Sequence, residues 1–369
     1  MWAALNERYD YLIVGSGLYG SVFAREMTDK GKKCLVIDKR PQLGGNVYCE
    51  DVEGITVHKY GAHIFHTDNE KVWAYVNRFA AFRPYTHRVT AVSGEKEYSL
   101  PFNMRTFEQL WGVKTPEEAK KKLASQRPKL DHEPENLEEQ ALALVGKDIY
   151  KTLVKGYTEK QWGRPCKSLP ANIIKRIPLR FTKDDRYFED KHQGIPEGGY
   201  NGLIEKLLEG IPAVTEMSYE KLVNAFPDIA KKTVYTGPID EFFGYELGQL
   251  EYRSLRFETE TLEQEDFQGH AVVNYCEKKP PYTRIIEHKH LSGQESPKTV
   301  VTREYPREWV PGREAYYPVG DERDQALYEQ YLELARERPE VIFGGRLGEY
   351  KYYDMDDAVA AALVRAEKE

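Results

Sequence analysis

Three glycines near the start of the chain have a spacing that can bind phosphate. Gly15, Gly17 and Gly20 form a G-x-G-x-x-G turn between the apolar run "YDYLIV" and a helical segment. The first glycine of such a turn permits the bend, the second lets backbone approach a pyrophosphate, and the third lets helix and strand pack closely. Asp38 ends the next apolar run, at the right distance to bind a ribose hydroxyl. The pattern predicts a dinucleotide site rather than a purely structural turn.

A second glycine pair indicates which dinucleotide is bound. Gly44, Gly45 and Asn46 follow the second predicted strand, where they bring more backbone close to the cofactor. This arrangement resembles that of flavoproteins of the glutathione-reductase-like class. It therefore favours FAD over NAD.

The far end of the chain adds to the same domain. Residues 341–369 predict a strand, a glycine turn and a helix with acidic residues at its start, where they suit the helix dipole. Such a helix could present its N-terminus to the flavin, or it could simply pack. A further strand, "KKTVYTGPID", ends at Gly237. We therefore predict a discontinuous FAD-binding domain formed by residues 1–80, about 195–245 and 320–369.

The middle of the chain predicts two further domains. A helix is expected over 66–80 after a Thr67/Asp68 cap, and a hairpin over 82–103. Thr115 and Glu118 form a capping box within a helical domain at about 105–160. Alternating residues over 250–305 predict an antiparallel sheet. This substrate domain would comprise about 82–104, 161–194 and 246–319. The fold class is α/β, mixed α+β overall, with a Rossmann-like core built from both chain ends.

Composition narrows the functional class. The chain has 369 residues and a net charge of −7, which argues against a general nucleic-acid binder. It contains no apolar run of about 20 residues that could enter a membrane, and no signal peptide is recognisable at its start. The four cysteines show no CxxC spacing, so a cytoplasmic location with free thiols is the default. His63 and His66 lack a third ligand, so no metal is expected.

Six longer segments, in this order, make the prediction more specific: "GYTEKQWG", "IIKRIPLRF", "QGIPEGGY", "PYTRIIEHKH", "YYPV" and "GGRLGEYKYYDM". With them the chain closely resembles the bacterial UDP-galactopyranose mutases from Tyr9 to about Ala361. The resemblance implies a flavin-dependent isomerase that interconverts UDP-galactopyranose and UDP-galactofuranose without net redox change. In that family only reduced FAD is active. Its N5 attacks the anomeric carbon, UDP leaves, and an iminium intermediate forms before the ring recloses.

The resemblance also assigns residues to the substrate. Arg176 and Arg284 would clamp the diphosphate, because a guanidinium fork suits phosphate oxygens. Trp162 would lie on a mobile loop beside the sugar and flavin, with Tyr157 able to donate to phosphate or sugar. Tyr187 would stack on uracil. The remaining substrate contacts are Asn274, Phe181, Arg253, Tyr317, Tyr352 and His87. Tyr316 is next to Tyr317 and Tyr353 is next to Tyr352. These neighbours remain alternatives, since only one tyrosine of each pair should point inward.

Cofactor contacts follow in the same way. His63 would lie near N5, where it could accept a hydrogen bond and influence the nucleophilicity of that nitrogen, which makes it a candidate catalytic residue. Arg346 and Asp354 would contact the flavin. The predicted cofactor-binding residues are Gly15, Gly17, Gly20, Asp38, Gly45, Asn46, His63, His66, Gly237, Arg346, Asp354 and Met355.

Two other classes of protein share the glycine pattern. One is an FAD-dependent oxidase or desaturase of the amine-oxidase-like class, and the other is a non-catalytic escort protein similar to the Rab GDP-dissociation inhibitors. Neither gives a reason for two arginines at a diphosphate. The resemblance further implies a homodimer that supplies galactofuranose to a cell-surface polysaccharide.

Overall fold

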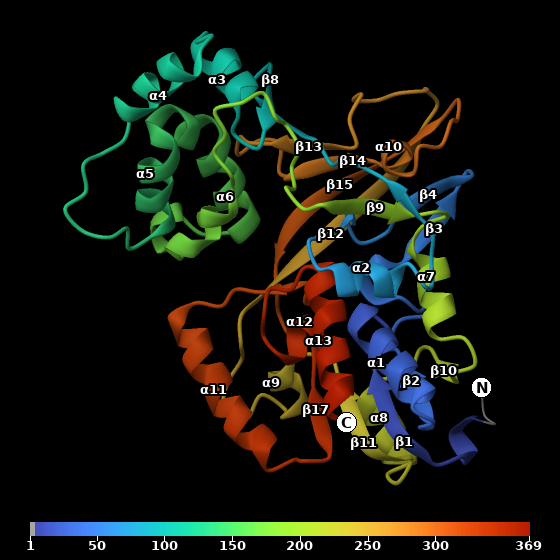
Figure 1. Cartoon of the computed structure of the whole chain (residues 1–369). Coiled ribbons are helices and arrows are strands. Elements are labelled where there is room, and N and C mark those ends of the chain that lie inside the picture. Colours follow the sequence, from blue (N-terminus) through green and yellow to red (C-terminus); the bar gives the residue numbers. More distant parts are fainter. Residues whose placement is uncertain (1–3) are drawn as a thin grey trace.

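The computed structural model describes residues 4–369, apart from the side chains at positions 4, 172, 175 and 176. Figure 1 shows a layered α/β part that contains both ends of the described chain, a large β-sheet above it, and a group of helices to one side. The predicted α/β class and the Rossmann-like core are confirmed. The three groups support the domain division that we propose.

A five-stranded parallel sheet forms the α/β part, in the order β10-β2-β1-β11-β17. The strand β2 is a continuous apolar run that is buried throughout, as expected for a strand covered on both faces of a parallel sheet. The sheet brings together segments that lie far apart in the sequence. The strands are β1 (Tyr9–Val14), β2 (Cys34–Ile37), β10 (Ala213–Val214), β11 (Ala230–Tyr235) and β17 (Val341–Phe343).

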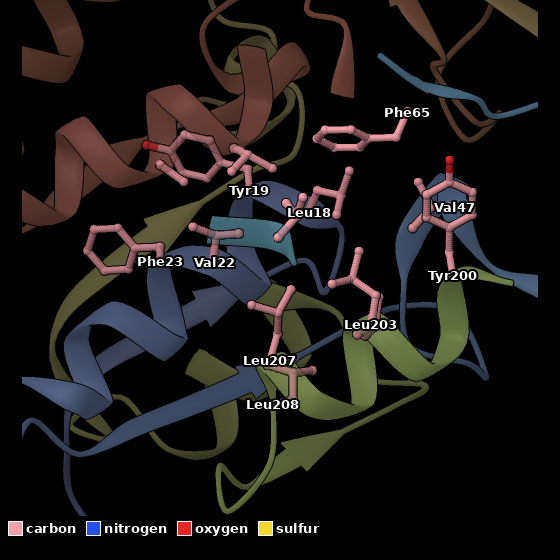
Figure 2. Close-up of a cluster of buried hydrophobic side chains, with 14 of the residues drawn as sticks. Leu18, Tyr19, Val22, Phe23, Val47, Phe65, Tyr200, Leu203, Leu207 and Leu208 are labelled. Carbon is pink, nitrogen blue, oxygen red and sulfur yellow. The ribbon is translucent and has the colours of Figure 1, made fainter. Parts of the chain in front are cut away.

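Three helices pack together beside this sheet: α1 (Leu18–Asp29), α7 (Tyr200–Leu207) and α13 (Met355–Lys368). Figure 2 shows how Val22 of α1 and Leu203 of α7 point into one cluster of buried side chains. Burying each aliphatic side chain of this kind contributes about 1.5–3 kcal/mol. The cluster therefore fixes α1, and with it the glycine turn at its start.

The helix predicted at the far end of the chain is α13. Asp354 is its N-cap and forms a capping box with Asp357. Thr67 Oγ1 donates to Asp356 Oδ2 at 2.7 Å, which ties the first turn of α13 to the strand β5 (Phe65–Thr67). The start of this helix is therefore held in place by both local and long-range contacts.

The second layer is a seven-stranded sheet in the order β16-β12-β15-β14-β13-β7-β8. It confirms the predicted hairpin and the alternating strands, and only the β13–β7 pair is parallel. Its strands are β7 (Val89–Ser93), β8 (Lys96–Leu100), β12 (Tyr252–Leu262), β13 (Val272–Tyr275), β14 (Arg284–Glu287), β15 (Thr299–Glu308) and β16 (Tyr317–Pro318).

The helical group runs from Met104 to Trp162, and we propose it as the helical domain. The capping box of Thr115 and Glu118 is present, with Pro116 in the first turn of its helix. The group consists of α3 (Met104–Trp111), α4 (Pro116–Ala124), α5 (Leu137–Ile149), a π-helical turn η3 (Tyr150–Val154) and α6 (Lys155–Trp162).

The helix predicted over 66–80 is shorter than expected. Phe65–Thr67 is strand β5, and helix α2 covers Glu70–Val76. The cap is Asn69, whose Oδ1 accepts from Lys71 N at 3.0 Å. Thr67 and Asp68 cannot cap the helix because the first accepts from Asn69 N and the second from Lys191 N.

The remaining elements are the long helix α11 and a set of short connections and edges. They are η1 (Ala4–Asn6), η2 (Gly45–Val47), β3 (Cys49–Val52), β4 (Ile55–His58), β6 (Phe82–Pro84), η4 (Cys166–Ser168), η5 (Ala171–Arg176), β9 (His192–Pro196), α8 (Tyr219–Ala225), α9 (Ile239–Phe242), α10 (His288–Ser292), α11 (Glu322–Arg336) and α12 (Gly345–Gly348). Within residues 4–369, no helix has both the length and the apolar character needed to cross a bilayer.

Candidate active site

A cavity of about 350 Å³ lies at the carboxyl end of the parallel sheet, where dinucleotides bind in this class of fold. Its walls come from the β1–α1 turn, the Gly44–Gly45 segment, the end of β11 and the start of α13. The predicted cofactor residues that line it are Gly15, Gly17, Gly20, Asp38, Gly45, Asn46, His63, Gly237, Arg346, Asp354 and Met355.

The glycine turn has the geometry that the sequence predicts. Gly15 has a φ of +104°, and a Cβ there would lie 2.1 Å from Thr236 Oγ1. A Cβ on Gly20 would lie 2.0 Å from the carbonyl oxygen of Gly15, so helix and strand are in close contact. Gly17, in contrast, has open space in front of it. The turn is tight on its protein side and accessible on its cavity side, which fits a pyrophosphate at the start of α1.

Asp38 is held at the edge of the cavity. Its Oδ2 accepts from Ser16 N at 2.9 Å and from Ser16 Oγ at 2.5 Å, and its Oδ1 accepts from Arg40 N at 3.0 Å. These bonds keep the carboxylate in one orientation next to the turn.

Arg40 is a cavity residue that the sequence reasoning missed. Its Nη2 donates to Glu314 Oε2 at 2.9 Å and to Asn46 Oδ1 at 3.0 Å, and its guanidinium lies 4.2 Å from the ring centroid of Tyr60. Its buried Nη1 has no hydrogen-bond partner among the described residues. A buried donor of this kind fits an acceptor on a bound nucleotide. A cation two residues after the strand-end Asp38 was the available signal.

His63 lies on the cavity wall with a defined tautomer. Its Nδ1 is 2.6 Å from the carbonyl oxygen of Gly61, so Nδ1 carries the proton and Nε2 is left as an acceptor. Burial, together with the charges of Arg346 and Arg284, lowers the pKa of His63 to about 4. The ring is therefore neutral near pH 7.

Arg346 is positioned by backbone carbonyls of its neighbours. Its Nη1 donates to the carbonyl oxygen of Tyr316 at 3.1 Å and its Nε to that of Tyr353 at 3.0 Å. Because the acceptors are neutral, the positive charge of Arg346 is retained at the cavity wall.

Arg284 is the centre of a second cluster. Its Nε donates to the buried carboxylate of Glu304 at 3.0 Å. This partner Glu304 lies beside Gly61, where a Cβ would be 3.5 Å from Glu304 Oε2, and Gly61 is the residue whose carbonyl oxygen bonds His63 at the cavity wall. Burial opposes the charge of Arg284, but Glu304 and the hydroxyls of Tyr157, Tyr187 and Tyr317 raise its pKa above the usual value. The guanidinium of Arg284 therefore stays protonated within this ion pair, among phenolic side chains.

The opposite side of this cluster is formed by α6 and β16. Gln161 Nε2 donates to Tyr317 Oη at 2.6 Å, and the rings of Trp162 and Tyr317 meet edge to face at 5.9 Å. Trp162 is the last residue of α6 rather than part of a loop, because Gly163 adopts a φ of +66° and ends the helix there. The ring of Tyr352 lies 5.7 Å from that of Tyr317.

In each of the two tyrosine pairs, Tyr316/Tyr317 and Tyr352/Tyr353, one member lines the cavity and the other belongs to the cluster. Tyr316 and Tyr353 line the cavity. Tyr317 and Tyr352 meet each other beside Trp162. This arrangement supports Tyr317 and Tyr352 as the substrate-facing members, as the resemblance implies.

Three further predicted residues lie in or next to the cluster. His87 packs against Phe188 and Tyr187, and burial followed by the charge of Arg284 lowers its pKa to about 3. Asn274 on β13 is the direct partner of Arg284 on β14. His87 Nδ1 and Asn274 Oδ1 are buried and have no partner within the described part of the chain. Arg253 donates from Nε to the carbonyl oxygen of Gln161 at 3.1 Å, which places it behind the end of α6.

The other predicted residues lie elsewhere. His66 bonds Asp190 at 3.0 Å and stacks on Phe188, and it is not among the residues that line the cavity. His63 and His66 therefore have different neighbours. Phe181 packs against Phe107 of α3. The side chain of Arg176 is outside the described residues, and its backbone ends η5.

Fold and cavity together define a dinucleotide-binding protein of the Rossmann-like class, and a model of NAD(P)-binding Rossmann-like domains matches residues 13–79. The family model of UDP-galactopyranose mutase matches residues 152–352, which hold the arginine–tyrosine cluster. A probable UDP-galactopyranose mutase of Klebsiella pneumoniae is 43% identical over 97% of this chain and 94% of its own length. The chain belongs to the UDP-galactopyranose mutase family.

Two further relatives bear on this assignment. A dTDP-fucopyranose mutase of Escherichia coli is 41% identical over 95% of this chain and 96% of its own length. A crystal structure of reduced UDP-galactopyranose mutase, at 14% identity, covers 97% of this chain and 93% of that chain with a TM-score of 0.75. The structural likeness shows the fold. The sequence relatives place the chain among mutases, a class of isomerase, that differ in their sugar nucleotide.

Proposed function

We propose that the protein interconverts UDP-galactopyranose and UDP-galactofuranose. One observation carries this proposal: Arg284 pairs with Glu304, which lies beside Gly61, and the carbonyl oxygen of Gly61 bonds His63 on the wall of the dinucleotide cavity. A sugar diphosphate at Arg284 would therefore place its sugar next to the inner end of a bound dinucleotide.

The dinucleotide that we propose is FAD. The glycine turn and Arg40 would hold its pyrophosphate and ribose, and Arg346, Tyr353 and Met355 would surround its inner part. When bound and reduced, FAD supplies an electron-rich nitrogen that can act as a nucleophile at a sugar carbon.

The chain's own residues would stabilise the departing diphosphate. Arg284 presents fixed positive charge where negative charge grows, and Arg176 is the second cation that the family resemblance assigns to this role. Burial raises the pKa of Tyr157 and Tyr317, so their hydroxyls stay protonated and can donate to phosphate oxygens. Trp162 and Tyr317 would cover the sugar and limit access of water.

His63 would provide a hydrogen-bond acceptor at the cavity wall. With Nδ1–H bonded to the carbonyl oxygen of Gly61, Nε2 can accept a hydrogen bond from a group inside the cavity. At a pKa of about 4 it acts as a hydrogen-bond acceptor, not as a general acid at neutral pH.

Two sugar nucleotides are candidates for the substrate, and the following residues would bind the nucleotide of the first, UDP-galactopyranose. Tyr187 could stack on the base, Asn274 Oδ1 could accept from its edge, and His87 could contact the sugar. The same groups could hold dTDP-fucopyranose, which is the second candidate because the Escherichia coli relative is a dTDP-fucopyranose mutase. Both substrates share the diphosphate and the pyranose ring that the cluster would bind.

The test is a chromatographic assay of the dithionite-reduced, FAD-loaded protein with UDP-galactofuranose and, in parallel, with dTDP-fucopyranose. We expect the pyranose isomer of the first substrate to appear, and to appear only with reduced protein. Faster conversion of dTDP-fucopyranose would assign the second candidate instead. Substrate oxidation with oxygen uptake would support the oxidase class, and a colourless protein that binds no flavin would support the escort class.

The setting of the reaction is also part of the proposal. The described cysteines are all buried and unpaired, which is consistent with a reducing, cytoplasmic environment. A homodimer and a role in supplying galactofuranose to a surface polysaccharide are expected from the family. Light scattering of the purified protein would test the homodimer.

A further inference from the structure

Lys160 makes an unusual set of contacts near the cluster. Its Nζ donates to three backbone carbonyl oxygens, those of Tyr275 at 2.8 Å, Pro280 at 3.0 Å and Tyr282 at 2.8 Å. Tyr275 is the last residue of β13, and Pro280 and Tyr282 belong to the connection that leads from β13 to β14. The ammonium group therefore joins the two sides of that connection to each other and to α6.

A lysine charge placed among neutral acceptors is costly to desolvate unless its donors are satisfied. Here each of the three N–H donors of Lys160 has an acceptor. The result is a specific geometry rather than a simple ion pair.

The connection that Lys160 holds leads directly into substrate-site residues. Asn274 is on β13 and Arg284 is its partner on β14. Tyr275 N donates to the carbonyl oxygen of Thr283 at 2.8 Å just beyond this pair. The hydrogen bonds of Lys160 therefore hold the hairpin next to the positions of Asn274 and Arg284.

The other end of the contact is α6, which carries Tyr157 and Trp162 on either side of Lys160. Figure 1 shows α6 on the side of the helical group that faces the large sheet. The helix approaches the same connection at Gly156, where a Cβ would lie 2.2 Å from the carbonyl oxygen of Cys276. Glu159 adds an ion pair with Lys278 at 3.5 Å. These contacts set the position of α6 relative to the hairpin.

We propose that Lys160 is a positioning residue that sets the spacing between the aromatic side chains of α6 and the Arg284–Asn274 pair of the hairpin, and so controls nucleotide-sugar binding. The inference rests on the proposed function for the identity of the ligand. Lys160 itself does not reach the reacting atoms. Its loss should therefore weaken ground-state and transition-state binding alike, which raises KM and leaves kcat nearly unchanged.

The main variant is Lys160→Met, which keeps the apolar stem and removes the three donors. Lys289→Met is the matched control, because Lys289 is a lysine on a short helix whose Nζ also donates to a backbone carbonyl, that of Ser296 at 3.1 Å. Both variants should melt at a lower temperature than the parent protein. Only Lys160→Met should raise KM, and the Kd of UDP measured by calorimetry, about tenfold or more, with kcat within about threefold of wild type.

A second variant tests the same spacing from the opposite side. Gly156→Ala leaves Lys160 intact but would push α6 away from Cys276. We expect the same rise in KM and in the Kd of UDP, with the bound-flavin spectrum unchanged. This variant keeps the proposal testable if Lys160→Met fails to fold.

The outcomes separate the two proposals. Absence of mutase activity in the parent protein overturns the proposed function alone, and the UDP titrations then decide the role of Lys160. If KM and the Kd of UDP stay within about twofold of the parent values in the folded variants, or rise equally in Lys289→Met, Lys160 is a purely structural residue and the inference is wrong.

Discussion

At the scale of single residues, the site depends on Arg284, a cation whose charge is partly compensated by the buried carboxylate of Glu304. Arg284 bonds one buried carboxylate and still faces three phenolic hydroxyls. A cation held in this way needs little reorganisation when a diphosphate leaves the sugar. Its geometry, and not only its charge, should therefore matter.

The first prediction concerns that geometry. Arg284→Lys keeps the charge but loses the planar fork, so we expect kcat/KM to fall about 100-fold or more, the size of effect seen when one donor to a developing anion is removed. Steady-state assays of the reduced protein would measure this. Arg303→Lys is the control, because Arg303 lies on β15 and pairs with Glu260 at the surface. Wild-type kcat/KM in Arg284→Lys would contradict the assigned role.

The second prediction concerns His63. His63→Ala removes the Nε2 acceptor from the cavity wall, and we expect kcat to fall about 10²-fold while FAD stays bound. The reason is that the cavity has many other contacts for the cofactor. Flavin absorbance after gel filtration and single-turnover kinetics would measure the two effects separately. His132→Ala, at an exposed histidine, is the control. If His63→Ala keeps flavin affinity and turnover, the proposed role is wrong.

At the scale of elements, the β1–α1 turn is the feature on which cofactor binding depends most. Gly20 lets α1 lie directly against the carbonyl oxygen of Gly15. Displacement of α1 would move the N–H groups that face the pyrophosphate.

The third prediction follows from this contact. Gly20→Ala should yield protein that has lost most of its bound flavin, because the added Cβ would lie 2.0 Å from a backbone oxygen. Gly202→Ala, in α7, is a matched control with open space around the added atom, and it should keep its flavin and gain up to about 1 kcal/mol of stability. The ratio of flavin to protein absorbance measures both results. Equal ratios in the two variants would contradict the prediction.

How far sequence could predict these elements depends on how local the signal is. The turn at Gly15 and the cap at Thr115 were predictable because a few adjacent residues determine each of them. The cap at Asn69 was missed because Thr67 and Asp68 are equally good caps by type and are occupied by other partners.

The site residues were predictable only in part. Arg40 and Glu314 are separated by 274 positions, and no local pattern links them. The partners of Lys160 are backbone carbonyls, which have no sequence signature. Which of Tyr316 and Tyr317 faces the cavity depends on the register of β16 against β12. Long segments shared with a family could suggest these residues, but packing and register decide where they point.

At the scale of the whole molecule, several histidines are buried in a neutral form. Burial lowers the pKa of His63 to about 4 and that of His87 and His288 to about 3, and it lowers the pKa of His58 well below its usual value. In the unfolded chain each of these groups would titrate near 6.5.

The fourth prediction is acid sensitivity. Because the native pKa values are lowered, the stability from these histidines is fully present above about pH 6.5 and is lost as the pH falls toward 4, as the unfolded chain takes up protons first. Each histidine should cost about 2 kcal/mol of unfolding free energy between pH 7 and pH 5. Urea denaturation at several pH values and constant FAD concentration would measure the slope of the unfolding free energy against pH. His288→Gln should show a shallower slope, and identical slopes would contradict the assignment.

The cofactor cavity also has a consequence for biosynthesis. Its walls include Gly15 from the first strand–helix turn and Ala358 from the last helix, so the ribosome must make nearly the whole chain before the cavity can close. At typical translation rates this takes roughly 20–70 s, during which the early glycine turn has no opposite wall. Flavin capture would therefore wait until α13 has been made, and a chain truncated before α13 would lack one wall of the cofactor cavity.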